Sequence, residues 1–461
     1  MRFTLLPIAV GILAGGCSSP SSVNDRHGDN AASLSRAAEA PRIDPVLQWN
    51  RVLLKIVRTP GAQPATVHPT RSFAMMHAAI YDAVNAIDAT HAPYAVRLHD
   101  VPRDASEDAA AAAAAHDVLV ALYPSFRPQF DEQLQESLAA IDDGAGKGNG
   151  ITVGQTVAAR IVTLRADDGS SATPPHFTLG VTPGGYQSTP PNFPAQPQFT
   201  HWSRVRPFAL KRANEFRPGP PALASDRYAD DLNEVKALGR ANDTLATADQ
   251  RLTGRFWNGA IQNYWNEIAQ TTSSARHLTT AENARLFALL NLTLADVVIG
   301  FYDAKYTYSL WRPVTAIRAA DTDGNPETIA DSAWLPLVGN TTPDPSYPGA
   351  HAAISAAALE ILHEVFAADK LSFSVTSEAL PGAERSFGSL SSAAREATLS
   401  RIFAGVHFRF DLTAGETLGR QVAGLVTHHL LTPRRGGSEE GAKHRDRSGN
   451  AVESTSSHLP R

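Results

Sequence analysis

Cysteine is almost absent from this chain, because Cys17 is the only one in 461 residues. A single cysteine excludes an internal disulfide framework and any metal site built from several thiolates. Beyond the first few residues there is no run of 18 apolar residues, so no transmembrane domain is expected. The charge is nearly balanced, at −5 with a pI near 6.3, and gives no reason to expect nucleic acid as a partner. These absences favour a protein that acts on a water-borne substrate.

The first residues have the pattern of a bacterial export signal. Arg2, the apolar run FTLLPIAVGIL and the small residues AGG precede Cys17, which predicts a lipoprotein-like signal over residues 1–17. The protein would then be exported, and either periplasmic or anchored to the cell envelope by a lipid on Cys17. The alternative is an ordinary secretory signal with an incidental Cys17, because the leucine lies one place further from it than such signals prefer. Residues 18–40 predict a flexible tether.

Helical periodicity covers most of the remaining chain. Apolar residues recur at spacings of three and four, and the predicted helices span residues 45–58, 70–90, 105–122, 127–142, 153–166, 226–238, 247–270, 281–311, 351–367, 390–404 and 411–431. A Pro- and Gly-rich passage over residues 169–222 cannot be regular helix, and no long repeat is evident. The expected fold is all-α, with two packed helical bundles and long Pro/Gly-rich connections. The first bundle and its connection would span 41–225 and the second 226–432, with a disordered tail over 433–461.

Two cations lie near the end of the helix predicted over residues 281–311. Lys305 and Arg312 are seven residues apart, or about two helical turns and roughly 10 Å along one face. Both side chains can therefore converge on one small anion. Pro313 disfavours helical geometry at Arg312 and predicts that the helix stops there.

The sequence PSYPGAH opens directly into a strong helix former. Pro348 and Gly349 precede HAAISAAALEILHEVF, so Gly349 and Ala350 are expected at a helix N-terminus, where free amides favour an oxyanion. Their side chains are small, which lets a ligand approach the backbone closely. His351 would lie beside that ligand.

The third group of residues is SRIFAGVHFRFD, beginning at Ser400. Arg401 and His407 are separated by Gly405, which predicts that they come from different turns or from either side of a helix break. His407 and Asp411 are four residues apart, so Asp411 can accept the Nδ1 hydrogen of His407 and leave Nε2 free. Each group alone would fit a solvated charge pair or a structural histidine. All three in this order indicate an oxyanion site.

Taken together, the three groups resemble the signature shared by vanadium-dependent haloperoxidases and type 2 phosphatidic acid phosphatases. That signature is Lys, six residues, Arg-Pro; then Pro-Ser-Gly-His; then Ser-Arg, five residues, His, three residues, Asp. The matching positions are Lys305, Arg312, Pro313, Pro348, His351, Ser400, Arg401, His407 and Asp411. Gly349 stands in place of the usual Ser and Ala350 in place of the usual Gly. The missing hydroxyl removes a hydrogen bond to the anion worth about 1.5–3 kcal/mol.

The resemblance implies two alternative chemistries at the same residues. In a haloperoxidase, Lys305, Arg312 and Arg401 would neutralise vanadate, His407 would be its ligand, His351 would act as acid and base, and halide and hydrogen peroxide would be the substrates. In a phosphatase, no cofactor is needed, and His407 would attack a small phosphate ester to form a phosphohistidine. A third alternative is a lipoprotein that binds oxyanions without catalysis. A homo-oligomer is compatible with each of them.

The wording of the motifs favours the haloperoxidase alternative, with two departures. SRIFAGVHFRFD and PSYPGAHA are similar to soluble haloperoxidases, closest to bacterial haloperoxidase-like proteins. Asp344 stands where such enzymes usually carry Phe or His, and Tyr302 where chloroperoxidases often carry Trp. An anionic Asp344 near the pocket is expected to repel halide.

Overall fold

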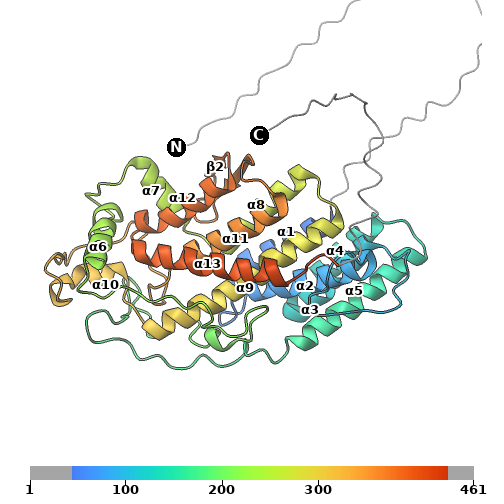
Figure 1. The fold of residues 1–461 in the computed structure, drawn as a ribbon, viewed down its shortest axis with the longest axis horizontal. Helices are drawn as coiled ribbons and strands as arrows, with labels where there is room; N and C mark the ends of the chain where they lie inside the picture. Colours follow the sequence, from blue (N-terminus) through green and yellow to red (C-terminus); the bar gives the residue numbers. More distant parts are fainter. Residues whose placement is uncertain (1–43, 435–461) are drawn as a thin grey trace, which may run out of the picture. The chain divides into compact units, whose positions relative to one another are not determined.

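A computed structural model describes residues 44–434 of the chain. The predicted signal, the tether and all but the first two residues of the predicted tail lie outside the described residues. Within them, helices dominate, as the periodicity predicts (Figure 1). The helices are α1 (Pro45–Arg58), α2 (Pro69–Asp88), α3 (Glu107–Leu122), α4 (Arg127–Ala139), α5 (Ala145–Leu164), α6 (Asp226–Leu238), α7 (Ala248–Phe256), α8 (Ile261–Arg276), α9 (Thr280–Tyr308), α10 (Pro313–Arg318), α11 (Ala350–Phe366), α12 (Leu390–Phe403) and α13 (Arg409–His429).

Three local features differ from the predicted helices. The helix expected over 247–270 is two helices, because α7 ends at Phe256 and α8 begins at Ile261. Helix α5 begins at Ala145, eight residues before the predicted start at 153. A short antiparallel hairpin, β1 (Phe373–Thr376) with β2 (Glu384–Phe387), pairs Phe373 with Phe387. Only the first of these changes affects the site, since the α7–α8 break faces it.

Two sets of three helices form the core. Helix α3 packs against α2 and α5 in the first set, and α11 packs against α9 and α13 in the second. Helices α2 and α9 also pack against each other and join the two sets. Helix α9 is long and apolar enough to cross a membrane, but 94% of its most apolar stretch is buried in the protein. It is therefore accounted for as the core helix of the second set.

The two sets of helices pack in the same way, although the sequence shows no repeat. Glycines four residues apart on α5 and α13 lie so close to α3 and α11 that a Cβ would collide with a carbonyl oxygen of the facing helix. Only glycine permits this close approach. The pairs are Gly150 on Ser106, Gly154 on Ala110, Gly415 on Gly349 and Gly419 on Ala353. The Ser106 amide donates to Gly146 O at 2.9 Å, and the Gly349 amide donates to Asp411 O at 2.9 Å. Thus the start of α3 corresponds to the start of α11, where the candidate site lies.

Candidate oxyanion site

Lys305 and Arg312 do not lie on one helix face. Helix α9 ends at Tyr308, because Ser309 adopts a left-handed conformation with φ 49°. Arg312 is instead the N-terminal capping residue of α10, in extended geometry. The prediction that the helix continues to residue 311, with both cations on one face, was therefore wrong, but the two side chains still come together on Asp344. Both side chains are buried and both contact Asp344.

Asp344 is the counterion of both cations. Its Oδ1 lies 3.3 Å from Lys305 Nζ and within hydrogen-bonding distance of the Arg312 guanidinium, and Gln198 Nε2 donates to its Oδ2 at 3.2 Å. Burial alone would raise the pKa of Asp344, but Lys305 and Arg312 outweigh that effect and hold it below its ordinary value. Asp344 is therefore a charged carboxylate inside the cationic cluster.

The ammonium of Lys305 has no hydrogen left for a ligand. It donates to Asp344 Oδ1, to Pro345 O and, at 3.2 Å, to Ser346 O, and an ammonium has three donors. Burial lowers the pKa of Lys305 to about 8, with Asp344 opposing and Arg312 reinforcing the shift. Lys305 thus acts on the site through its charge and through the loop it holds.

The start of α11 supplies free amides, although not the one expected at Gly349. The Gly349 amide is occupied by Asp411 O, so the expectation that it faces a ligand was wrong. Helix α11 begins at Ala350, and among the described residues no acceptor is found for the amides of Ala350, His351 and Ala352. Amides in the first turn of a helix point outward and favour an anion.

Arg401 and His351 meet at the break between α7 and α8. Arg401 NH1 lies 3.5 Å from Trp257 O, and its NH2 donates to Asn258 Oδ1 at 3.2 Å. His351 Nε2 lies 2.8 Å from the same Trp257 carbonyl. Sequence reasoning missed Trp257 and Asn258, because the break itself was not predicted.

Arg401 is a buried guanidinium without a carboxylate partner among the described residues. It is 4% exposed, and its Nε has no hydrogen-bond partner. Burial lowers its pKa to about 9, and repulsion by Arg312 adds to the shift. An unpaired buried charge is costly, so this arrangement is suited to an anion that arrives from outside.

His407 lies between α12 and α13, after the turn at Gly405. Its Nδ1 is 2.9 Å from Asp411 Oδ2, and its Nε2 is 3.1 Å from Arg312 NH1. Asp411 Oδ2 also accepts the Ser346 hydroxyl at 2.5 Å, a contact that the sequence did not predict. The carboxylate fixes the ring so that Nε2, not Nδ1, faces the cationic cluster.

The five predicted side chains interact electrostatically, since the other four all lower the pKa of His407. The pKa of His407 is far below its ordinary value because of burial and then repulsion by Arg312, Lys305, Arg401 and His351. The pKa of His351 is lowered by burial and then by Arg401. Both imidazoles are therefore neutral, and the lone pair of His407 Nε2 faces Arg312 NH1 at 3.1 Å.

The long Pro/Gly-rich passage over 169–222 also reaches the site. The backbone amide of Gln198 donates to Pro343 O at 2.8 Å, and its side-chain Nε2 donates to Asp344. Tyr306 on α9 donates its hydroxyl to Gln198 O. This passage therefore fixes the residues that precede PSYPGAH, a role that its composition did not reveal.

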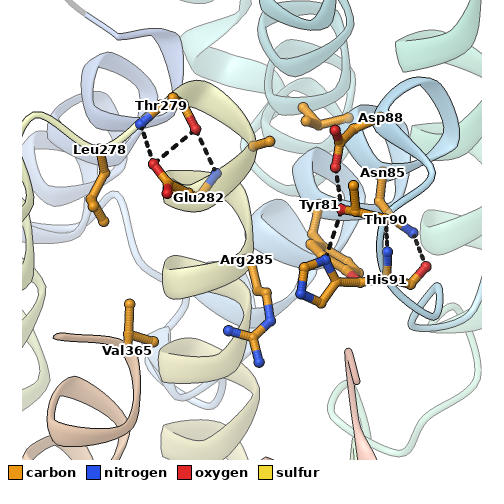
Figure 2. Close-up of a pocket in the computed structure, with 12 residues that line it drawn as sticks. Tyr81, Asn85, Asp88, Thr90, His91, Leu278, Thr279, Glu282, Arg285 and Val365 are labelled. Carbon is orange, nitrogen blue, oxygen red and sulfur yellow. Dashed lines mark hydrogen bonds between the residues drawn. The ribbon is translucent and has the colours of Figure 1, made fainter. Parts of the chain in front are cut away.

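A separate cavity of about 430 Å³ lies between α2, α9 and the end of α11 (Figure 2). Arg285 is the only lysine or arginine among its lining residues, which include His91, Tyr81 and Val365. Figure 2 shows the side chains of Arg285 and His91 among those that line this space. None of the predicted site residues lines the cavity, so it is distinct from the oxyanion site.

Comparisons with known proteins agree with this fold. Residues 285–436 match the family model of the VCPO second helical-bundle domain, a segment that contains every predicted site residue. A curated relative, vanadium chloroperoxidase from Curvularia inaequalis, is 24% identical over 81% of this chain and 80% of its own length.

Solved structures with the same fold include two bacterial proteins. The first bacterial vanadium-dependent iodoperoxidase is 24% identical, with a TM-score of 0.72 over 84% of this chain and 95% of that one. The holo form of a bacterial vanadium-dependent chloroperoxidase is 16% identical, with a TM-score of 0.61 over 85% of this chain and 94% of that one.

Fold and site together define a helical-bundle protein with a buried cluster of cationic side chains and histidines. The matched second-bundle domain and the relatives are those of vanadium haloperoxidases, so this protein is similar to that superfamily of enzymes over the matched domain and in its fold.

Proposed function

We propose that this protein is a vanadate-dependent haloperoxidase-like enzyme, which oxidises halide with hydrogen peroxide to hypohalous acid. The observation that carries the proposal is Arg401, a buried guanidinium that shares the Trp257 carbonyl with His351 and has no carboxylate partner within residues 44–434. The first turn of α11 adds the amides of Ala350, His351 and Ala352, which have no acceptor among the described residues. An oxyanion would satisfy both groups.

The residues present fit vanadate in charge and in donor type. His407 would hold it through Nε2, because Nδ1 faces Asp411 at 2.9 Å and fixes the ring. Arg401, Arg312 and the amides after Gly349 would surround its oxygens. Within residues 44–434, no group of three His, Cys, Asp or Glu side chains gathers to hold a bare cation, which suits a group held as an oxyanion. When bound, vanadate would supply a Lewis-acid centre that activates peroxide.

His351 is the residue placed to move a proton. Its Nε2 donates to Trp257 O at 2.8 Å, so in the neutral ring Nδ1 is the basic nitrogen. Its lowered pKa keeps it unprotonated before peroxide arrives. The ring can then take a proton from peroxide and return it to the product.

The test is an assay of the purified full chain for both reactions, with and without vanadate. Bromination of a phenol-red-type dye that requires vanadate, peroxide and bromide supports the proposal. Phosphate release from p-nitrophenyl phosphate, inhibited by vanadate and lost in His407→Ala, would instead identify a phosphatase that uses the same residues. Tight oxyanion binding without either activity would leave a binding protein.

A further inference from the structure

The carboxylate of Asp344 changes the charge that the site offers to a ligand. Lys305, Arg312 and Arg401 bring three positive charges, and Asp344 and Asp411 are both buried among them. Asp411 is held by His407, the Ser346 hydroxyl and the Phe408 amide. Three cationic side chains therefore face two carboxylates, which leaves about one positive charge for a ligand.

A small movement of side chains cannot increase the net positive charge of the site, because both Lys305 and Asp344 are held in place by hydrogen bonds. Each hydrogen of the Lys305 ammonium is already donated, to Asp344, Pro345 and Ser346. Asp344 itself is held on its other oxygen by Gln198. A second negative charge on the ligand would therefore lie near a fixed carboxylate and find no free cation.

We propose that Asp344 is a specificity-determining residue, which makes the site prefer singly charged tetrahedral oxyanions over doubly charged ones of the same size. This inference rests on the proposed function and deepens it. Vanadate carries mainly one negative charge at neutral pH, whereas a phosphate monoester carries about two. Asp344 thus favours vanadate over the substrate of a phosphatase.

Perrhenate and tungstate are matched probes for this inference. Both are tetrahedral and similar in size, they carry one and two negative charges respectively, and neither titrates between pH 7 and 9. Calorimetric titration of the full chain should show perrhenate binding at least as tightly as tungstate. In Asp344→Asn, the ratio of affinities should shift toward tungstate by about tenfold or more.

Two further variants separate charge from structural damage. Gln198→Leu removes the donor to Asp344 but keeps its charge, and should retain the wild-type preference. Asp249→Asn, at an exposed carboxylate paired with Arg385, makes the same change in net charge and should also retain it.

The outcomes distinguish this inference from the proposed function. If Asp344→Asn binds both anions with the wild-type ratio, the specificity role is wrong while the oxyanion site stands. If the wild type binds neither anion, both the specificity role of Asp344 and the proposed oxyanion site are wrong. Should Asp344→Asn fail to fold, the wild-type ratio still decides, because a tungstate preference above about tenfold contradicts the inference.

Discussion

His351 and Arg401 share one acceptor, the carbonyl oxygen of Trp257, at 2.8 and 3.5 Å. The two side chains come from α11 and α12, and the carbonyl comes from the end of α7. A carbonyl orients a guanidinium but does not neutralise it. Arg401 thus remains positioned for an anion that the described part of the chain does not provide.

Replacing Arg401 should separate binding from stability. Arg401→Met removes an uncompensated buried charge, so the free energy of unfolding of the empty protein should stay equal or rise. Oxyanion affinity should fall by at least about tenfold. Urea unfolding and calorimetry measure the two effects. A large loss of stability in the empty protein would show that Arg401 is structural.

Asp411 should govern the orientation of His407. In Asp411→Asn the amide is neutral and cannot serve Ser346, the Phe408 amide and His407 in the same way. Loss of such a partner typically costs about 10–100-fold in affinity or activity. Vanadate affinity and dye bromination should both decline, whereas Asp249→Asn should leave both unchanged. Equal affinity in Asp411→Asn and the wild type would contradict the orienting role.

Substitutions at position 349 test how much the missing hydroxyl would contribute to anion affinity. A Cβ there would lie 3.1 Å from Leu412 Cδ2 and 3.3 Å from Asp411 O, so any side chain is tight. Gly349→Ala measures that steric cost, and Gly349→Ser adds the hydroxyl to it. We expect the Ser variant to bind vanadate more tightly than the Ala variant, by about 1.5–3 kcal/mol. Identical affinities would mean that the hydroxyl does not reach the anion.

Stability and anion affinity should depend on pH in opposite directions. The pKa values of Lys305 and Arg401 are lowered by burial to about 8 and about 9. Above pH 8 the folded state loses protons that the unfolded state keeps, so the free energy of unfolding of the empty protein should rise toward pH 9. Perrhenate affinity should fall over the same range, since the cations are lost.

Lys305→Met is the control for this pH dependence. It should show a smaller rise in unfolding free energy between pH 7.5 and 9, because the lower of the two pKa values is removed. Urea unfolding at fixed ionic strength measures the slope. A wild-type stability that is flat or falls over this range would show that neither group titrates there.

Residues 1–17 lie outside the described residues, and we propose that they direct export with lipid attachment at Cys17. Expression in a bacterial host should then yield a membrane-associated form that incorporates labelled palmitate. Cys17→Ser should be released in soluble form and unlabelled. Unlabelled, soluble wild-type protein would favour the ordinary secretory signal.

The sequence predicted the helices and most of the site because both depend on local patterns. Apolar periodicity located α1 and α6 to the residue. The spacing of His407 and Asp411 predicted their hydrogen bond, although His407 precedes α13 and does not lie on a turn of that helix.

Features that depend on tertiary contacts could not be predicted in this way. The amide of Gly349 is taken by Asp411 O, and Gln198 reaches Asp344 from a loop that is distant in sequence. The sequence placed Asp344 near the pocket but did not reveal that it pairs with Lys305 and Arg312. Such pairings arise from packing between elements, which no short motif encodes.

The equivalent glycine contacts of α5 and α13 allow the first helix pair to serve as a control for the second. Gly154→Ala and Gly419→Ala should push apart equivalent helix pairs, but only the second pair carries His351 and Asp411. Any loss of catalysis from the second substitution beyond that from the first is therefore attributable to the chemistry of the cluster and not to loosened packing.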